Sequence, residues 1–301
     1  MPAEDPRGEE SPKLGGGEQQ SGAPTARRIV LGAQLRRLRE AADISRADAG
    51  YAIRGSDSKI SRMELGRVGF KERDVADLLS MYGVDDAEER AVFLDMVRKS
   101  NERGWWHRYS GTMPNWFQDY VGLEESASLI QSYELQFVPG LMQTEAYVRA
   151  VVSHGNPHRL DEDSERRVAL RLQRQKVLTR QNAPRIWAVV DESVLHRPIG
   201  GTRVLREQIE HLLELTRQPN VTLQILPYEM SGYAAEGAFS ILRFAEPTLP
   251  DIVYIEHLSG ALYLDRVEEL EVYGRVIDRL AVDAETPDRS RQMLSKFRQE
   301  I

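Results

Sequence analysis

The sequence predicts a mainly α-helical N-terminal domain followed by a larger C-terminal domain of mixed α/β structure. The chain has 301 residues, which is enough for two cores, since single domains cluster at about 100 to 200 residues. Apolar side chains recur at helical spacing through most of the first hundred residues. Beyond about residue 180, short β-branched runs are interspersed with helical segments, which is typical of a sheet covered by helices.

The segment 1–26 consists largely of Pro, Gly, Ser, Glu and Gln, with almost no large apolar side chain. Such a segment buries too little surface to offset chain entropy, so the sequence predicts a disordered arm at 1–26. Its composition lacks the basic and apolar regions of a secretory signal. No stretch of the chain approaches the roughly 20 apolar residues of a membrane span, so we expect no membrane association and a cytoplasmic location.

Helical spacing predicts a compact domain at 27–84 with helices at 29–42, 46–52, 57–65 and 71–82. This segment holds 12 basic and 8 acidic side chains, a net charge of +4, on a chain whose total is −7. A locally basic module on an acidic chain is typical of a domain that faces DNA. A further helix at 86–103, with Val92, Phe93, Met96 and Val97 as its apolar stripe, begins a linker and aromatic junction at 85–115.

The stretch SRADAGYAIRGSDSKISRMELGR, residues 45–67, has the signals of two short helices joined by a tight turn. Ser45 and Ser56 are expected N-caps, and Gly66 ends the second helix. We expect Ile60, Met63 and Leu65 to face the core of the domain. The other side chains of the second helix are short hydrogen-bonding groups and cations, the types that a major groove accepts, and they include Ser58, Lys59, Ser61 and Arg62.

The run KISRMELGR resembles the Cro-type, or XRE-like, helix-turn-helix regulators, and the resemblance covers 27 to about 84. It implies that the helix with this run reads bases in double-stranded DNA. The implied base-side residues are Ser56, Asp57, Ser58, Lys59, Ser61 and Arg62, with Arg46 and Arg67 on phosphates. Asp57 would repel phosphate unless it sits at the helix N-terminus or accepts from a cytosine amine. Gly50 and Arg54 stand where the family usually has Ala and Gly, and Gly50 is expected to cost about 1 kcal/mol of helix propensity.

Three of the four tryptophans, Trp105, Trp106 and Trp116, lie in the junction. We weigh two roles for them: they cement the second domain to the linker, or they bind a partner protein. In the domain at 116–301, helices are expected at 123–134, 144–154, 161–181, 202–217, 266–282 and 289–299. Strands are expected at 186–190, 221–226, 239–244, 252–255 and 261–264, the first two as a parallel crossover and the last two paired around Gly260.

The segments YVGLEESASLIQSYELQFVPGLMQTEAYVRAVV, GGTRVLREQIEHLLEL and VTLQILP resemble a family of actinobacterial regulators that includes the WhiJ-like developmental regulators. Members are antitoxin-like and often act with a small acidic protein of the BldB-like kind. The resemblance implies a nucleoid-associated repressor whose C-terminal domain receives such a partner. We also expect a homodimer, because one short recognition helix reads too few base pairs for useful specificity.

Two alternatives place other chemistry in the second domain: a small-molecule pocket, or an enzyme with a DNA-targeting arm. The chain has no cysteine, and its six histidines lack the spacing of metal ligands, so we expect neither a metal nor a cofactor. Asp191, Glu192, Glu236 and Glu256 are the best acidic candidates for catalysis. No base, nucleophile elbow or phosphate loop accompanies them, so the sequence predicts no catalytic residues and a regulator that is not an enzyme.

Overall fold

A computed structural model of the protein describes residues 24–155, 162–229, 237–247 and 249–301. Residues 1–23 of the predicted disordered arm lie outside the described residues. Helix α1 (Pro24–Ala41) includes the last three residues of the predicted arm. Thr25 and Ala26 are buried, at 4% and 2% exposure, so the arm prediction is wrong for these last residues. The reason lies in tertiary packing, because Thr25 contacts the second domain.

The N-terminal domain is a bundle of α1 with α2 (Arg46–Ala52), α3 (Asp57–Glu64), α4 (Glu72–Met81) and α5 (Ala87–Ser100). The four helices predicted within 27–84 are confirmed to within a few residues, apart from the earlier start of α1. Phe93, Met96 and Val97 of α5 share one hydrophobic core with α1 to α4. Helix α5 therefore belongs to the helical domain, whereas the sequence placed it in a linker. Val92, expected in the same apolar stripe, is 54% exposed.

The C-terminal domain is built on one six-stranded mixed sheet of strand order β3-β2-β1-β4-β5-β6. Strands β1, β2 and β3 are parallel, whereas β4, β5 and β6 continue the sheet in antiparallel pairs. This arrangement confirms the predicted fold class and both predicted pairings. The strands are β1 (Leu129–Glu134), β2 (Arg185–Asp191), β3 (Val221–Leu226), β4 (Phe239–Arg243), β5 (Ile252–His257) and β6 (Gly260–Leu264).

One prediction in this domain is wrong: 123–134 was expected to be a helix. Helix α6 (Asn115–Ser126) ends before this segment is half complete, and Leu129–Glu134 forms the central strand β1. Strand β1 pairs with β2 on one side and with β4 on the other, so its conformation is fixed by partners more than 50 residues away. Local propensity is overridden by these non-local hydrogen bonds.

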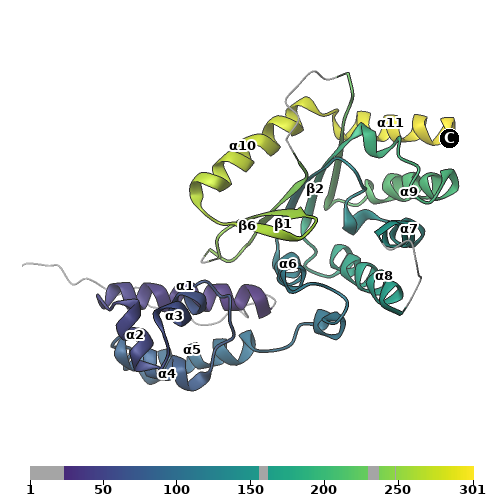
Figure 1. The fold of residues 1–301 in the computed structure, drawn as a ribbon. Coiled ribbons are helices and arrows are strands. Elements are labelled where there is room, and N and C mark those ends of the chain that lie inside the picture. The colour runs from purple at the N-terminus through teal and green to yellow at the C-terminus, as the bar shows by residue number, and fades with distance from the viewer. Residues whose placement is uncertain (1–23, 156–161, 230–236, 248) are drawn as a thin grey trace, which may run out of the picture.

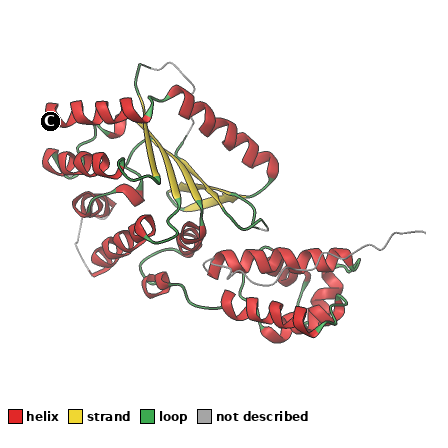
Figure 2. Ribbon diagram, turned by 180° about the vertical axis from the view of Figure 1, so that it is seen from behind, coloured by secondary structure: helices red, strands yellow, loops and turns green. Residues whose placement is uncertain are grey.

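Helices cover both faces of the sheet (Figures 1 and 2). Helices α6, α7 (Glu145–Gly155), α9 (Thr202–Leu215) and α11 (Pro287–Glu300) bury apolar side chains against one face. Helix α10 (Val267–Asp283) packs against the other face. Helix α8 (Glu162–Gln175) packs on α7 and on the short 3-10 helix η2 (Gly140–Met142). Three further 3-10 helices are η1 (Trp105–Tyr109), η3 (Lys176–Thr179) and η4 (Glu192–Val194).

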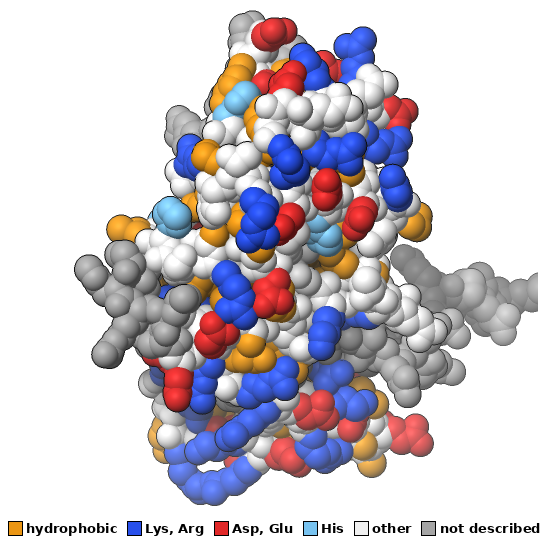
Figure 3. All heavy atoms as spheres, turned by 90° about the vertical axis from the view of Figure 1, so that its right-hand side faces the viewer, with side chains coloured by type: hydrophobic (Ala, Val, Ile, Leu, Met, Phe, Trp, Pro, Cys, Tyr) orange, Lys and Arg blue, Asp and Glu red, His pale blue; other side chains and the backbone are white. Residues whose placement is uncertain are grey.

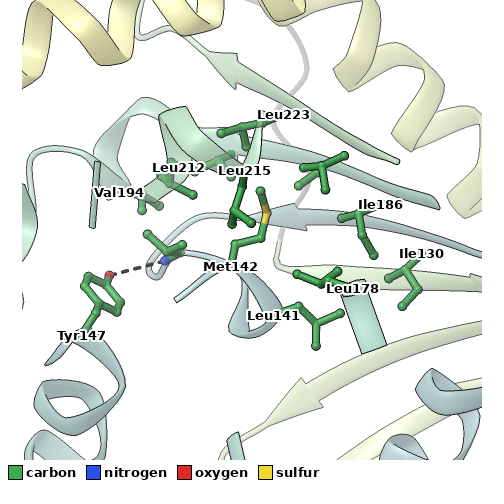
Figure 4. Packing of buried hydrophobic residues seen from close by; sticks show 14 of the residues in the cluster. Ile130, Leu141, Met142, Tyr147, Leu178, Ile186, Val194, Leu212, Leu215 and Leu223 are labelled. Carbon is green, nitrogen blue, oxygen red and sulfur yellow. Dashed lines mark hydrogen bonds between the residues drawn. The ribbon is translucent and has the colours of Figure 1, made fainter. Parts of the chain in front are cut away.

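The larger core of this domain lies between the sheet and the first group of helices (Figure 4). Met142 and Tyr147 are fully buried in it. The hydroxyl of Tyr147 accepts a hydrogen bond from the amide of Val138 at 3.4 Å, and the Gln208 side chain donates to the carbonyl of Met142 at 2.8 Å. These bonds fix the segment that follows β1 against α7 and α9.

The two domains meet where the N-terminal end of α1 lies on α6. Gly122 of α6 leaves room for Thr25, since a Cβ at Gly122 would lie 2.7 Å from the Cβ of Thr25. Arg28 of α1 lies 3.6 Å from the carboxylate of Asp119. Burial raises the pKa of Asp119, and Arg28 opposes that rise. Helix α1 is thus one rigid element that contacts both the second domain and, further along, α3.

Candidate nucleic-acid interface

The helix-turn-helix begins with two capped helices. The Ser45 side chain accepts from the amide of Asp48 at 3.1 Å, and the Ser56 side chain accepts from the amide of Lys59 at 3.2 Å. Both N-caps predicted from the sequence are therefore confirmed. Gly66 takes a positive φ of 65° and ends α3 as predicted. The caps satisfy backbone donors that a short helix otherwise leaves open, so α3 starts at a defined residue.

Gly50 and Arg54, the two positions that depart from the helix-turn-helix pattern that the sequence resembles, lie in α2 and in the turn that follows it. Arg54 adopts a positive φ of 51°, a conformation that favours Gly. The amide of Gly55 donates to the carbonyl of Gly50 at 2.8 Å. A Cβ at Gly50 would lie 2.8 Å from the carbonyl carbon of Ser56, so Ala does not fit there. Gly50 lets α2 and the start of α3 approach closely. Replacing it with Ala would therefore not recover the helix propensity that Gly50 is expected to cost.

A buried ion pair joins α3 to α1 on the side of α3 that faces the core. Arg39 of α1 donates to Glu64 of α3 through Nε at 2.5 Å and Nη2 at 3.1 Å, and through Nη1 to the carbonyl of Ile44 at 2.9 Å. The hydrogen bond to Glu64 raises the pKa of Arg39. The expectation that Leu65 faces the core is wrong: Leu65 is 39% exposed, and Glu64 takes the inner position. The sequence did not indicate that an acidic residue would be buried there.

Helix α1 also contacts the C-terminal end of α3 at two glycines. A Cβ at Gly32 would lie 2.6 Å from the carbonyl oxygen of Glu64, and a Cβ at Gly66 would lie 2.7 Å from the Cα of Ile29. Backbone therefore meets backbone at both points, which leaves α3 little freedom to shift along α1. Ile60 and Met63, predicted to face inward, are 1% and 2% exposed and complete this contact.

Most of the predicted DNA-binding side chains lie on the exposed side of this unit. Exposed members are Arg46, Ser56, Asp57, Ser58, Arg62 and Arg67, whereas Lys59 and Ser61 are half-buried. Arg46 at the start of α2 lies 3.3 Å from the carboxylate of Asp57 at the start of α3. The positive charge of Arg46 compensates the negative charge of Asp57. The repulsion of phosphate by Asp57, expected from the sequence, is thereby reduced.

Two cations of α3 differ in their availability. The Nζ of Lys59 lies 2.5 Å from Oδ2 of Asp74 in α4, and its side chain is 32% exposed. The Nε of Arg62 donates to the carbonyl of Ser58 at 3.2 Å, which leaves its Nη groups over the exposed face. Lys59 therefore joins α3 to α4, while Arg62 is the cation of α3 that is free to reach a base or a phosphate.

A hollow of about 340 Å³ lies beside α3, between α1 and the start of α2. Its lining combines three arginines and two glutamates with one serine and one leucine: Arg36, Arg39, Glu40, Arg46, Ser61, Glu64 and Leu65. Figure 3 shows Lys and Arg side chains grouped at the lower edge of the molecule, at the height of the helical domain in Figure 1. The positive charge predicted for this domain is thus carried on its surface.

The junction tryptophans do not form one exposed surface. Trp106 is 2% exposed and packs with Met113, Val121 and Leu170. Trp105 is half-buried and donates to Glu125 at 3.3 Å, and Trp116 is half-buried against the larger core. Trp106 is therefore not accessible to a partner in this structure, and its contacts are those of a residue that joins the linker to the second domain.

The acidic candidates for catalysis have structural partners. Asp191 caps η4 by accepting from the amide of Ser193 at 2.9 Å, and Glu192 accepts from the amide of Tyr228 at 2.9 Å. Glu236 lies outside the described residues. Within the described part of the chain, no group of three or more His, Asp or Glu side chains is arranged to hold a metal ion. No described helix is long and apolar enough to cross a membrane.

Comparison with known proteins gives two family matches. A model of a helix-turn-helix domain matches residues 30–92, and a model of a domain of unknown function, DUF5753, matches residues 117–296, more than half of the chain. No curated protein matches the chain, and no solved structure does either. The first match covers the capped helices and the exposed face described above. The chain belongs to the family of proteins that carry the DUF5753 domain, here joined to an N-terminal helix-turn-helix domain.

Proposed function

We propose that the protein is a sequence-specific DNA-binding transcriptional regulator, a repressor of the Cro-type (XRE-like) class. The observation that carries the proposal is the exposed start of α3, where Ser56, Ser58 and Arg62 project from a helix held by caps, an ion pair and close backbone contacts. Short donors near the N-terminus of a recognition helix reach base edges, and longer cations reach guanine or phosphate. In this proposal Arg46 and Arg67 contact phosphates.

The contacts of α3 support different roles for its two cations in this proposal. Arg62 reads the DNA, whereas Lys59, paired with Asp74, acts mainly by holding α3 in place. We therefore expect Arg62→Ala to weaken specific binding by about 1 to 3 kcal/mol without changing the melting temperature. Arg275→Ala is the matched control, since Arg275 is an exposed arginine of α10 that lies 3.6 Å from Glu271. An unchanged affinity of Arg62→Ala for the specific site would refute the assignment of α3 as the reading helix.

The C-terminal domain receives the signal in this proposal. The resemblance to WhiJ-like, antitoxin-like regulators supports a small acidic BldB-like partner protein and a homodimer on paired half-sites. The half-buried Trp105 and Trp116 are the junction tryptophans that such a partner would reach. A pull-down with the small acidic protein tests this: retention by the full chain supports it, and no retention at micromolar concentration contradicts it.

A small-molecule signal is the second candidate. The observation that favours it is that burial shifts the pKa of two partly exposed side chains of the C-terminal domain, Arg171 and Glu134, which have no hydrogen bond or ion pair to a described residue.

A further inference from the structure

One leucine of the second domain is buried in the core of the helical domain. Leu249 lies in the β4–β5 connection, of which residues 244–247 and 249–251 are described. Its side chain is 5% exposed and packs in a core whose other buried members all come from residues 26–97. The core of the helical domain is therefore completed by a side chain from the other domain.

The backbone around Leu249 is constrained. The amide of Leu249 donates to the carbonyl three residues earlier at 3.1 Å, which closes a turn. Pro247 and Pro250 flank this part of the connection, and a proline restricts its own φ and the conformation of the residue before it. At the base of the connection, Arg243 donates to Asp251 at 2.8 Å. Little chain entropy is therefore left to lose when Leu249 packs in the helical domain.

Side chains of both domains share this contact. Ile29 of α1 packs against the core of the helical domain and also against the larger core of the second domain. Phe244, at the start of the β4–β5 connection, packs against the same two cores. Close to Ile29, Thr25 lies against Gly122 of α6, where the helical domain meets the second domain (Figures 1 and 2). The first two turns of α1 thus carry apolar contacts that continue into the core of the second domain.

Ile29 also lies against the end of α3. A Cβ at Gly66, the residue that ends α3, would lie 2.7 Å from the Cα of Ile29. Three residues further along α1, Gly32 meets the carbonyl of Glu64, and Arg39 then pairs with the Glu64 side chain. Packed backbone yields little, so a displacement of the first turns of α1 is passed on to α3.

The second domain leaves the proposed DNA-binding face of α3 open. Ser56, Ser58 and Arg62 are exposed while the two domains are in contact. The contact between the domains therefore acts on DNA binding through the position of α3, since it does not cover these side chains. We expect this contact to favour DNA binding.

We propose that Leu249 and Ile29 are positioning residues for DNA binding. Leu249 anchors the second domain in the helical core, and Ile29 transmits the position of that domain to the end of α3. The inference rests on the proposed function, because it concerns how α3 is held for DNA. It also gives a route by which a ligand or partner of the second domain changes DNA affinity, namely a shift of the β4–β5 connection relative to α1.

Hydrogen exchange of the full chain without DNA tests the anchoring. Leu249→Ala removes apolar contacts from the helical core, so the amides of α1 and α3 are expected to exchange at least about tenfold faster than in the wild type. The amides of β2 and α9, which pack in the other core, should keep their wild-type rates. Faster exchange confined to the second domain, or unchanged exchange in α1 and α3, would overturn the proposal.

Two further variants separate this contact from a general effect. Leu249→Met nearly conserves the side-chain volume and is expected to keep the exchange of α1 and α3 close to that of the wild type. Leu258→Ala removes a fully exposed leucine of the same domain and should change none of the rates. If Leu258→Ala accelerates α1 and α3 as much as Leu249→Ala does, the burial of Leu249 is not the cause and the proposal is wrong.

DNA binding supplies a readout that a purely structural residue would not change. At a temperature at which Leu249→Ala is folded, we expect it to bind the duplex upstream of its own gene about tenfold more weakly than the wild type, and Leu249→Met to bind like the wild type. Because coupling is reciprocal, the same duplex should slow the exchange of α6 and of the β4–β5 connection in the wild type, which needs no variant. Equal Kd values for the wild type and Leu249→Ala would overturn the positioning role.

Failure of the proposed function gives a different result. In that case the wild type itself would show no preference for the upstream duplex over a scrambled one. The exchange rates measured without DNA would still decide whether Leu249 holds α1 and α3.

Discussion

The buried pair of Arg39 and Glu64 is the contact through which α1 most directly holds α3. The perturbation that tests it is Glu64→Gln, which keeps the shape of the side chain and removes its charge. Arg39 then remains charged among Ile44 and the core with only a neutral amide as its partner. We expect the helical domain to lose stability while the fold of the second domain is retained.

The magnitude follows from burial. The side chains of Arg39 and Glu64 are 10% and 6% exposed, so solvent screens their interaction little. Removing one partner of a buried ion pair costs about 3 to 5 kcal/mol, because the other charge stays uncompensated. The matched control is Glu72→Gln. Glu72 pairs with Arg98 at 3.4 Å in the same domain, but both side chains are more than half exposed, which limits the cost to about 1 kcal/mol or less.

Urea unfolding with two optical probes measures the effect. All four tryptophans, at 105, 106, 116 and 187, lie outside the helical domain, so their fluorescence reports on the junction and the second domain. Far-UV circular dichroism reports on all helices. We expect Glu64→Gln to shift the circular-dichroism midpoint far more than Glu72→Gln does. If the two variants lower the circular-dichroism midpoint equally, the Arg39–Glu64 pair does not hold α3 on α1, and the magnitude worked from its burial is wrong.

Three further predictions concern local fit, titration and the contact between domains. Gly50→Ala should lower Tm because its Cβ meets the backbone of the following turn, whereas Gly274→Ala, in α10 with no atom within 4 Å of the new Cβ, should stabilise by about 0.5 to 1 kcal/mol; equal effects in calorimetry would contradict the close approach. The folded-state pKa of Glu134 is raised from 4.5 to about 8, so folded Glu134 binds the extra proton and stability should fall as the pH rises from about 5 to about 8; Glu134→Gln should flatten that part of the pH–stability profile, and an unchanged profile would refute the assignment. Gly122→Ala places a Cβ 2.9 Å from the Trp106 ring, so it should change tryptophan emission and loosen the junction to proteolysis; wild-type emission and cleavage rates would show that the junction tolerates it.

The sequence predicts the helix-turn-helix well because its determinants are local. Ser45 and Ser56 cap helices within three residues of themselves, and Gly66 ends α3 by its own backbone conformation. Such signals are visible in any window of a few residues. The exchange of roles between Glu64 and Leu65 was not visible, because burial of Glu64 depends on Arg39, 25 residues earlier in the chain.

The second domain was harder to predict because its centre is held by distant partners. Strand β1 carries Gln131 and Ser132 at buried positions, and its polar composition resembles a helix segment more than a core strand. The error placed Glu134 on a helix, so its position at the carboxyl end of the central strand β1 could not be foreseen. The burial of Arg174 was equally hidden, since α8 is rich in arginines and only packing distinguishes the one that pairs with Glu124.

The central claim is that α3 reads a DNA sequence. Fluorescence anisotropy of the full chain on the DNA upstream of its own gene, at two salt concentrations and with a scrambled duplex as control, tests it most directly. The account predicts binding that prefers the upstream duplex and weakens steeply with salt, as phosphate contacts release counterions. Equal affinity for the two duplexes at both salt concentrations would contradict it.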